Sequence, residues 1–492
     1  MNTDDAKNEL IFHLEKAREW LLINGAEKSF ALTNDEIELA FERGKILLSF
    51  PSDRGFQTWR VTNYKFEKQK IHLNLSRNFG VEKAKIELAP RVSADEFSET
   101  TELARIEKTN KIARLIIENQ PRAKLVRVSL KKENGRLAQI IFENPQGSQI
   151  AVFVDVSGTL ASERILTTAI LEAEKLRGRK KNPIEKIWIL AERKSARNLQ
   201  KLLALLKQNW QASVQIIEFS EKENKNPQPL SHLTISDLWR AKPSKISAVE
   251  NSILSETARK IIAFAPKEID AIFTNRGETL RFQGLPFARI RKLGDAEKAW
   301  FGVEAKRQSL NEKTFEEFLE LIENLKIYRR FDTPNKRHAF YALAPEAWLE
   351  SILRRNIKRL DANLILSPIY NQFRAGRDKI DLLALRKDGR LIVIELKTSA
   401  DRASVFQALD YWREIEIERR TGNLQKAEIF GDAEIKREPT LVYLAAPLLA
   451  FDRDFKFLAQ TVSPEIEIYR FDLNQNWREK LRVIRQEKTS AE

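Results

Sequence analysis

The pattern of apolar and polar residues divides the chain into segments with a strand period and segments with a helix period. Short alternating runs, such as KIHLNLS (70–76) and FARIRKL (287–293), predict two β-rich modules. The second is followed by residues 313–328, whose apolar residues share one face of a predicted helix. After each β-rich module the pattern predicts a β-hairpin, a helix, and then alternating strands and helices, which is typical of an α/β arrangement.

The two predicted hairpins resemble each other in sequence. GRLAQIIFENPQGSQIAVFVDVSG (135–158) matches GRDKIDLLALRKDGRLIVIELKTSA (376–400) after one inserted residue. Gln139 then falls on Asp381, an offset of 381 − 139 = 242, and the later apolar positions coincide without a gap. We therefore predict a tandem duplication. The alternative is that two α/β units look alike by pattern alone.

A polar stretch with two prolines, SEKENKNPQPLSH (220–232), predicts a linker between the two halves. The predicted protein is multidomain, α/β and α+β. Its predicted parts are a leading helix with a β-rich module (1–98), an α/β domain (99–219), a linker (220–249), a helix with a second β-rich module (250–335), a second α/β domain (336–475) and a polar C-terminal tail (476–492).

Composition narrows the chemistry that the chain can perform. A net charge of +15 and a pI near 9.6 favour a polyanionic partner, either nucleic acid or a membrane surface. The longest apolar run, LVYLAAPLLAF, has eleven residues and is too short to cross a bilayer. The acidic N-terminus lacks the apolar core of a signal peptide, so we expect a cytoplasmic protein that does not associate with membranes.

Residue types also limit the kinds of metal site. The chain has no cysteine, which excludes thiol nucleophiles and thiolate metal sites. Its four histidines are far apart in the sequence, so a histidine-rich site is not expected. A metal would need oxygen ligands, and these favour magnesium or manganese.

The strand LIVIELK (391–397) carries charge where a buried strand is predicted. Side chains alternate along a strand, so Glu395 and Lys397 share one face with Leu391 and Val393. The turn at Asp388-Gly389 brings Asp381 close to Glu395. A plain ion pair between Glu395 and Lys397 is one explanation. Two converging carboxylates beside one lysine favour a divalent cation instead, and that arrangement can hydrolyse a phosphodiester.

Asp381, thirteen intervening residues and then Glu395-Leu396-Lys397 resemble the motif of the PD-(D/E)XK nuclease superfamily. The wider segment 375–412 is similar to the C-terminal nuclease domain of the mismatch-specific endonuclease family and its relatives, although the proline of the motif is absent. The resemblance implies a restriction-endonuclease-like mixed sheet flanked by helices, Mg²⁺ or Mn²⁺ as cofactor, and cleavage of DNA, as by an endonuclease in DNA repair or defence.

The resemblance also implies roles for individual residues. Asp381 and Glu395 would be metal ligands, with the Leu396 carbonyl as a third, and Lys397 would be the catalytic lysine. Gln407 on the following helix would support the site. The helix PEAWLESILRRNIKRLD (345–361) resembles the first helix of the family, which makes Glu350 the candidate acidic residue and Glu346 its alternative.

Basic residues cluster around this motif and suit a phosphate backbone. Tyr411 matches a tyrosine of the family on the helix after the hairpin. The residues that we expect to contact nucleic acid are Arg354, Arg355, Lys358, Arg374, Arg377, Lys379 and Tyr411.

The first hairpin has Gln139, Phe153 and Asp155 at the positions of Asp381, Glu395 and Lys397, so it cannot form the same centre. We predict one active centre per chain, which means that cutting both strands of a duplex would need a homodimer or successive nicks. The alternative function is a nucleic-acid-binding protein whose nuclease-like fold does not cleave.

Overall fold

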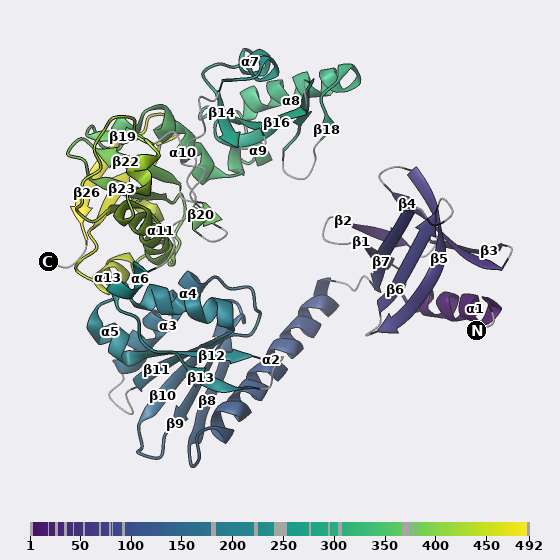
Figure 1. The fold of residues 1–492 in the computed structure, drawn as a ribbon, viewed down its shortest axis with the longest axis horizontal. Coiled ribbons are helices and arrows are strands. Elements are labelled where there is room, and N and C mark those ends of the chain that lie inside the picture. Colours follow the sequence, from purple (N-terminus) through teal and green to yellow (C-terminus); the bar gives the residue numbers. More distant parts are fainter. Residues whose placement is uncertain are drawn as a thin grey trace. The chain divides into compact units, whose positions relative to one another are not determined.

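The structure, a computed structural model, forms two compact units, Met1–Glu107 and Lys108–Glu492. The residues that it describes are 3–17, 19–24, 28–33, 37–42, 44–52, 55–67, 70–77, 80, 82–90, 94–178, 184–220, 225–240, 253–274, 277–293, 296–303, 308–366, 374–375, 378–379 and 381–489. The mixed α/β, multi-sheet organisation that the sequence predicts is observed (Figure 1).

The first unit is an antiparallel sheet with order β2-β1-β7-β6-β5-β4-β3. In β6 the alternating residues Ile71, Leu73 and Leu75 are buried, and the helix α1 adds Leu10 and Leu14 to the same core. The elements are α1 (Thr3–Leu14), β1 (Glu19–Asn24), β2 (Lys28–Thr33), β3 (Glu38–Glu42), β4 (Lys45–Ser52), β5 (Gly55–Glu67), β6 (Lys70–Arg77) and β7 (Glu82–Pro90), followed by α2 (Ala94–Glu118), which runs into the second unit.

The second unit begins with a mixed sheet of order β13-β12-β11-β10-β9-β8, which we call the first α/β sheet. Its strands are β8 (Lys124–Lys132), β9 (Leu137–Glu143), β10 (Gln149–Asp155), β11 (Ile184–Ala191), β12 (Val214–Ser220) and β13 (Lys225–Pro229). Its helices are α3 (Ser162–Arg177), α4 (Arg193–Leu203), α5 (Gln208–Ser213) and the short α6 (Ile235–Leu238).

An antiparallel module follows, with strands paired in chain order from β14 to β18. Phe318, Ile322 and Leu325 on one face of α8 are buried in its core. The elements are α7 (Glu256–Ile262), β14 (Ile269–Thr274), β15 (Gly277–Phe282), β16 (Leu285–Leu293), β17 (Ala296–Phe301), β18 (Gln308–Ser309), η3 (Glu312–Thr314), α8 (Phe315–Tyr328) and α9 (Ala339–Ala342).

The chain ends in a mixed sheet of order β19-β22-β23-β24-β25-β26, which we call the second α/β sheet. Its strands are β19 (Leu364–Leu366), β22 (Leu382–Arg386), β23 (Leu391–Leu396), β24 (Leu441–Pro447), β25 (Ile468–Leu473) and β26 (Val483–Lys488), and a small hairpin joins β20 (Arg374–Ala375) to β21 (Asp378–Lys379). Its helices are α10 (Pro345–Arg355), η4 (Ile357–Arg359), α11 (Ser404–Arg420), α12 (Asn423–Lys426), η6 (Leu448–Ala450) and α13 (Phe455–Gln460).

The two α/β sheets have the same strand order and the same strand directions. In both, a central antiparallel hairpin is followed by two parallel pairings and an antiparallel edge strand. Both hairpins turn at a glycine with positive φ, 84° at Gly147 and 89° at Gly389, a conformation that favours glycine. In the first hairpin Gln139 pairs with Phe153, and in the second Leu382 pairs with Ile394, so the two registers coincide after a shift of 242 residues. The topology therefore supports the predicted duplication.

The helices between the two α/β sheets share one apolar core. Apolar residues of α3 and α4 pack in one cluster with apolar residues of α11 and α13, and the cluster continues to strands on both sides. On their other faces, the first sheet packs against α2 and the second against α10. The two sheets therefore form a layered body with their helices between them.

Two of the predicted boundaries need correction. Residues 225–229, inside the predicted linker, form the edge strand β13, and Leu233 and Trp239 pack against the shared core. Proline is compatible with an edge strand because the missing N–H faces away from the sheet. Residues 221–224 and 241–249 of that linker lie outside the described residues. The predicted C-terminal tail contains β26, and its Trp477 and Leu481 are buried in the core beside α10. Both strands are polar edge strands, which do not show the apolar alternation of a half-buried strand.

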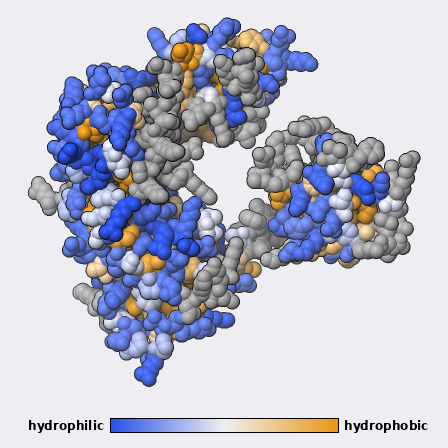
Figure 2. Space-filling model, in the orientation of Figure 1, coloured by the Kyte–Doolittle hydropathy of each residue, from blue (hydrophilic) through white to orange (hydrophobic). Residues whose placement is uncertain are grey.

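The surface seen in Figure 2 is mostly hydrophilic, as expected from a chain in which 32% of residues are charged. Across the part of the chain that the structure describes, no helix combines the length and the apolar character needed to span a bilayer.

Candidate active site

Three charged side chains meet where the hairpin of the second α/β sheet ends. Asp381 directly precedes β22, Glu395 lies in β23 and Lys397 follows β23. Glu395 is 2% exposed, and its Oε1 lies 2.8 Å from Nζ of Lys397. The Oδ2 atom of Asp381 accepts a hydrogen bond of 2.8 Å from the backbone N–H of Leu396. The structure therefore brings together Glu395 and Lys397, which the strand period places on one face, and Asp381, which the hairpin turn brings close to them.

The charge at Glu395 is poorly compensated. Its Oε2 atom is buried and has no hydrogen-bond partner among the described residues. Burial raises the pKa of Glu395 well above its usual value, and the negative charge of Asp381 raises it further, while Lys397 opposes both. Burial alone would lower the pKa of Lys397, but Glu395 and Asp401 raise it above its ordinary value. The lysine is therefore a cation at neutral pH.

Further carboxylates surround this centre. A narrow cleft beside Glu395 and Lys397 is also lined by Asp401 and Asp452. Nζ of Lys397 lies 3.6 Å from Oδ2 of Asp401, so the ammonium group sits between two carboxylates. Glu346, at the start of α10, accepts a long hydrogen bond of 3.5 Å from the N–H of Thr398 and raises the pKa of both Glu395 and Lys397.

The residues present fit a hard divalent cation in chemistry. Among the described residues, no three Asp, Glu, His or Cys side chains have a metal-binding arrangement. What the centre offers is a pair of carboxylates, Asp381 and Glu395, one of which has an unpaired buried oxygen. Oxygen donors of this kind are the ligands that Mg²⁺ and Mn²⁺ prefer. The Oε1 atom of Gln407, on α11, is also buried and without a partner among the described residues.

Glu350 does not join this centre, which corrects the choice made from the sequence. It is buried at 4% exposure, and its Oε1 lies 3.1 Å from Nη1 of Arg281, a residue of β15. Arg281 also pairs with Asp270. The alternative, Glu346, lies one turn earlier on α10 and points its charge toward the centre. Glu350 thus joins α10 to the antiparallel module.

Tyr411 is also placed differently from the expectation. Its ring is 7% exposed and packs with Leu383, Val393 and Ile415 in the core under the hairpin, so it is not available at a nucleic-acid surface. The spacing explains this, because Tyr411 and Ile415 are four residues apart on the face of α11 that meets the sheet. The Leu396 side chain is buried on the opposite face, and the role of its carbonyl stays a prediction.

The basic residues expected to contact nucleic acid fall into two groups. Lys358 and Arg355 are exposed, and Arg354 is half-buried on α10. Arg355 lies near the acidic Asp270 of the antiparallel module. Arg377 lies outside the described residues, as do the side chains of Arg374 and Lys379, whose backbones form the β20–β21 hairpin beside α11.

The corresponding positions of the first α/β sheet have a different environment. Phe153 is fully buried in the shared apolar core, and Gln139 is 3% exposed. Asp155 is held by the loop that follows it: its Oδ1 accepts hydrogen bonds from the N–H and O–H of Ser157 and the N–H of Gly158, and its Oδ2 accepts one from the N–H of Leu160. Asp155 therefore organises the approach to α3 and offers little to a ligand.

Three residues near the centre were not identified from the sequence. Asp401 precedes α11 by a few residues, so its closeness to Lys397 could have been inferred from the strand-to-loop-to-helix order. Asp452 comes from the loop after η6 and has no local signal. Arg164, on α3 of the first copy, has Nη2 3.7 Å from Oδ1 of Asp401 and Nη1 3.4 Å from Oε2 of Glu133.

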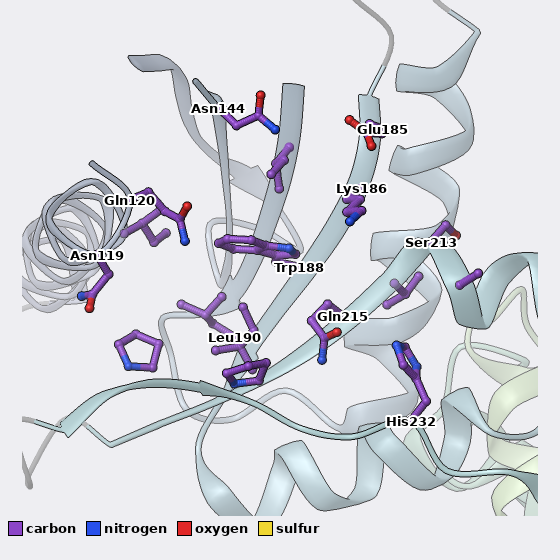
Figure 3. Close-up of a pocket in the computed structure, with 17 residues that line it drawn as sticks. Asn119, Gln120, Asn144, Glu185, Lys186, Trp188, Leu190, Ser213, Gln215 and His232 are labelled. Atoms are coloured by element: carbon purple, nitrogen blue, oxygen red, sulfur yellow. The ribbon is translucent and has the colours of Figure 1, made fainter. Parts of the chain in front are cut away.

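A separate cavity of about 530 Å³ lies between α2 and the first α/β sheet (Figure 3). Trp188 and Lys186 of β11 line it, together with His232, Gln215 and Asn144. The Gln215 amide donates to the carbonyls of Ile216 and Leu230, and the Asn144 side chain accepts from the N–H groups of its own turn. These polar groups serve the fold, so the charged centre of the second sheet is the stronger candidate.

Comparison with known proteins adds little. No protein-family model and no curated protein matches the chain. The solved structure of EndoMS in its apo form has a TM-score of 0.18 and 14% identity, over 44% of this chain and 95% of that chain. A complex of EndoMS with double-stranded DNA has a TM-score of 0.16 and 16% identity, over 38% and 81%. Similarity this weak carries no argument for fold or function.

Proposed function

We propose that the chain is a metal-dependent nuclease that hydrolyses phosphodiester bonds of DNA, with its active centre at Asp381, Glu395 and Lys397. The observation that supports this most is the buried, unpaired Oε2 of Glu395 beside a second carboxylate. Lys397 pairs with Oε1 of Glu395, but the second carboxylate and the unpaired oxygen still cost free energy of folding unless a further cation compensates them. The antiparallel hairpin does not require this charge, because the first copy forms the same hairpin with Gln139 and Phe153.

Each residue has a distinct part in this proposal. Asp381 and Glu395 would hold Mg²⁺ or Mn²⁺, and Glu346 lies close enough to Glu395 to act on its charge. Gln407, whose buried Oε1 has no partner among the described residues, would support them. The bound metal would supply charge stabilisation of the phosphate and a more acidic water. Lys397, held as a cation between Glu395 and Asp401, would donate a hydrogen bond to a phosphate oxygen or orient the attacking water.

The charge pattern favours a nucleic acid, and DNA is the substrate that we propose. A chain with a net charge of +15 attracts phosphate by releasing counterions. The exposed Arg355 is the last residue of α10, and the exposed Lys358 lies in η4 directly after it. An endonuclease in DNA repair or defence is the role that we propose. The other candidate, a nucleic-acid-binding protein without cleavage, does not account for a buried carboxylate that has one unpaired oxygen and a second carboxylate beside it.

The test is cleavage by the purified full chain. Single-stranded, duplex, mismatched and branched DNA, and RNA of the same sequences, are incubated with Mg²⁺, with Mn²⁺ or with a chelator. We expect metal-dependent cleavage of DNA that falls at least about 100-fold in Asp381→Asn and Lys397→Ala. Lys387→Ala, an exposed lysine on the same hairpin, is the matched control and should cleave normally. Binding without cleavage under either metal would favour the binding protein instead.

Metal binding provides an independent readout. Calorimetric titration of the protein with Mn²⁺, without DNA, should give a binding signal that weakens at least tenfold in Asp381→Asn and not in Lys387→Ala. Cleavage that survives both the chelator and the Asp381→Asn substitution would reject the proposed centre.

A further inference from the structure

The two α/β copies meet through topologically equivalent segments of the chain. Leu206 follows α4 by a short turn, Val462 follows α13 by an equivalent turn, and the two residues form an antiparallel bridge. The N–H of Lys207 donates to the carbonyl of Thr461, and the N–H of Ser463 donates to the carbonyl of Leu205, both at 2.9 Å. These two hydrogen bonds flank an antiparallel bridge. In each copy the bridging segment follows the helix that connects the second and third parallel strands, α4 between β11 and β12 or α13 between β24 and β25. Equivalent segments therefore meet, as they do in a twofold, dimer-like interface.

The interface is also extensive and apolar. The cluster that joins the copies includes Leu202 and Leu203 of α4, Leu458 and Ala459 of α13, and Trp412 of α11, all less than 4% exposed. Trp210 packs edge-on against Phe457, with ring centroids 6.1 Å apart, and Trp239 packs against Trp412 at 5.9 Å. Interfaces of this kind resemble a domain core and belong to permanent assemblies. The apolar face of each α/β copy is therefore covered by the other copy of the same chain.

The paired copies hold unequal centres. The second copy has Asp381, Glu395 and Lys397, whereas Phe153 of the first copy is packed into the shared core. The first copy instead contributes Arg164, whose guanidinium reaches Asp401 at the edge of the second centre. The surroundings of the active centre thus include Arg164 of the first copy as well as residues of the second copy.

We propose that the chain is a self-contained pseudo-dimer with one working centre, and that it cuts one strand of duplex DNA in each binding event. The inference rests on the nuclease function proposed above. Water adds across one P–O bond: its oxygen bonds to phosphorus, the bond to one sugar oxygen breaks, and that oxygen takes a proton. The opposite strand stays intact because the first copy carries no equivalent centre.

The products from a supercoiled plasmid test the strand count. A negatively supercoiled plasmid with an inverted repeat presents duplex, junction and single-stranded loops on one molecule. With Mg²⁺ and the full chain we expect open circles to accumulate before any linear DNA, at a rate proportional to protein concentration. Linear DNA formed directly from the supercoiled form, at a rate that rises with the square of protein concentration, would overturn the proposal in favour of an intermolecular dimer.

A cysteine pair tests the internal interface without any cleavage. The chain has no cysteine, and Leu206 and Val462 form the kind of close pair, flanked by hydrogen bonds, that suits a disulfide. Oxidised Leu206→Cys/Val462→Cys should migrate on a denaturing gel as a single chain and faster than its reduced form, and neither single variant should show this shift. A disulfide-linked dimer as the main product would overturn the pseudo-dimer. If the disulfide forms within one chain but no DNA is cut, the proposed nuclease function fails while the interface stands.

Discussion

The two α/β sheets have the same strand order and the same hairpin register, and they differ most at three positions. The first copy fills these positions with Gln139, the core residue Phe153, and Asp155, whose carboxylate is used by its own loop. The second copy has a buried glutamate with an unpaired oxygen and a lysine held between carboxylates. The hairpin therefore folds without the charges that the second copy has at these three positions. The presence of Asp381, Glu395 and Lys397 in the second copy is better explained by function than by folding.

Substitution of Glu395 should give the largest effect and is the strictest test of the difference between the two copies. Glu395→Gln removes the charge and keeps the shape, so we expect cleavage to fall at least about 100-fold. Thermal unfolding should show a stability close to that of the parent chain, because a buried charge with an unpaired oxygen is removed while Lys397 keeps Asp401 as a partner. Both are measured on the same preparation, with the cleavage rate expressed per folded molecule.

A clear loss of stability in Glu395→Gln would mean that the ion pair with Lys397 holds the hairpin together. The charges would then serve the fold, and the argument from the first copy would fail.

The reverse substitution places a glutamate at the equivalent position of the first copy. Phe153→Glu places a carboxylate in an apolar core, without the lysine and cleft that accompany Glu395. We expect a loss of roughly 3–5 kcal/mol in the free energy of unfolding, measured by urea denaturation, because the charge is buried without a partner. Phe153→Leu keeps the site apolar and should cost less than about 1.5 kcal/mol. Equal losses in the two variants would show that size matters here and charge does not.

Local patterns were enough to predict the charged centre. Strand period and a tight Asp-Gly turn place Asp381, Glu395 and Lys397 together, and both are properties of a short segment. Local sequence patterns could not distinguish Glu346 from Glu350, because the two residues lie one turn apart on the same side of α10. Arg281, from a separate antiparallel module, takes Glu350 and leaves Glu346 for the centre.

The edge strands of the two α/β sheets and the interface between the two copies could not be predicted from the sequence, because both depend on contacts with distant segments. The strands β13 and β26 are polar and depend on backbone pairing with a neighbour, so their sequences carry no apolar alternation. The apolar faces of α3 and α11 predict burial but not the surface that covers them. That these faces cover each other emerges only from the structure.

The two glutamates of α10 should separate stability from catalysis. Glu350→Gln weakens a buried ion pair with Arg281, which keeps Asp270 as a second partner, so we expect a loss of about 1–3 kcal/mol in unfolding free energy and a normal cleavage rate per folded molecule. Glu346→Gln should leave stability within about 0.5 kcal/mol and lower the cleavage rate severalfold. If Glu350→Gln lowered cleavage and Glu346→Gln did not, the acidic residue chosen from the sequence would be restored.

Asp155 offers a smaller test in the first copy. Asp155→Asn replaces one acceptor oxygen by an amide group that cannot accept from the N–H of Leu160, and we expect a loss of about 1 kcal/mol. Cleavage per folded molecule should not change, because the residue organises only the loop before α3. A fall in cleavage at unchanged stability and unchanged DNA binding would assign the first copy a part in the chemistry.

The hairpin turns give the smallest expected difference, and it depends on pH. In the second copy Asp388 accepts from Arg386 and from the N–H of Arg390, and the guanidinium of Arg386 holds the pKa of Asp388 down at about 2. Because this pKa is lower in the folded state, the contribution to stability is complete above about pH 4 and is lost as pH falls through about 2. The Asp388 side chain is 42% exposed, so solvent screens the pair and the contribution is only a few tenths of a kcal/mol.

The first hairpin turn uses the neutral Asn144 in a similar way, so its stability should not change over the same pH range. Unfolding of Asp388→Asn is compared with the parent chain at pH 6 and at pH 2.5. The parent should be slightly more stable at pH 6, and the gap should shrink at pH 2.5. A gap that stays constant would mean that Asp388 acts in the turn through hydrogen bonds alone, as Asn144 does, and that the two turns differ only in which side chain accepts.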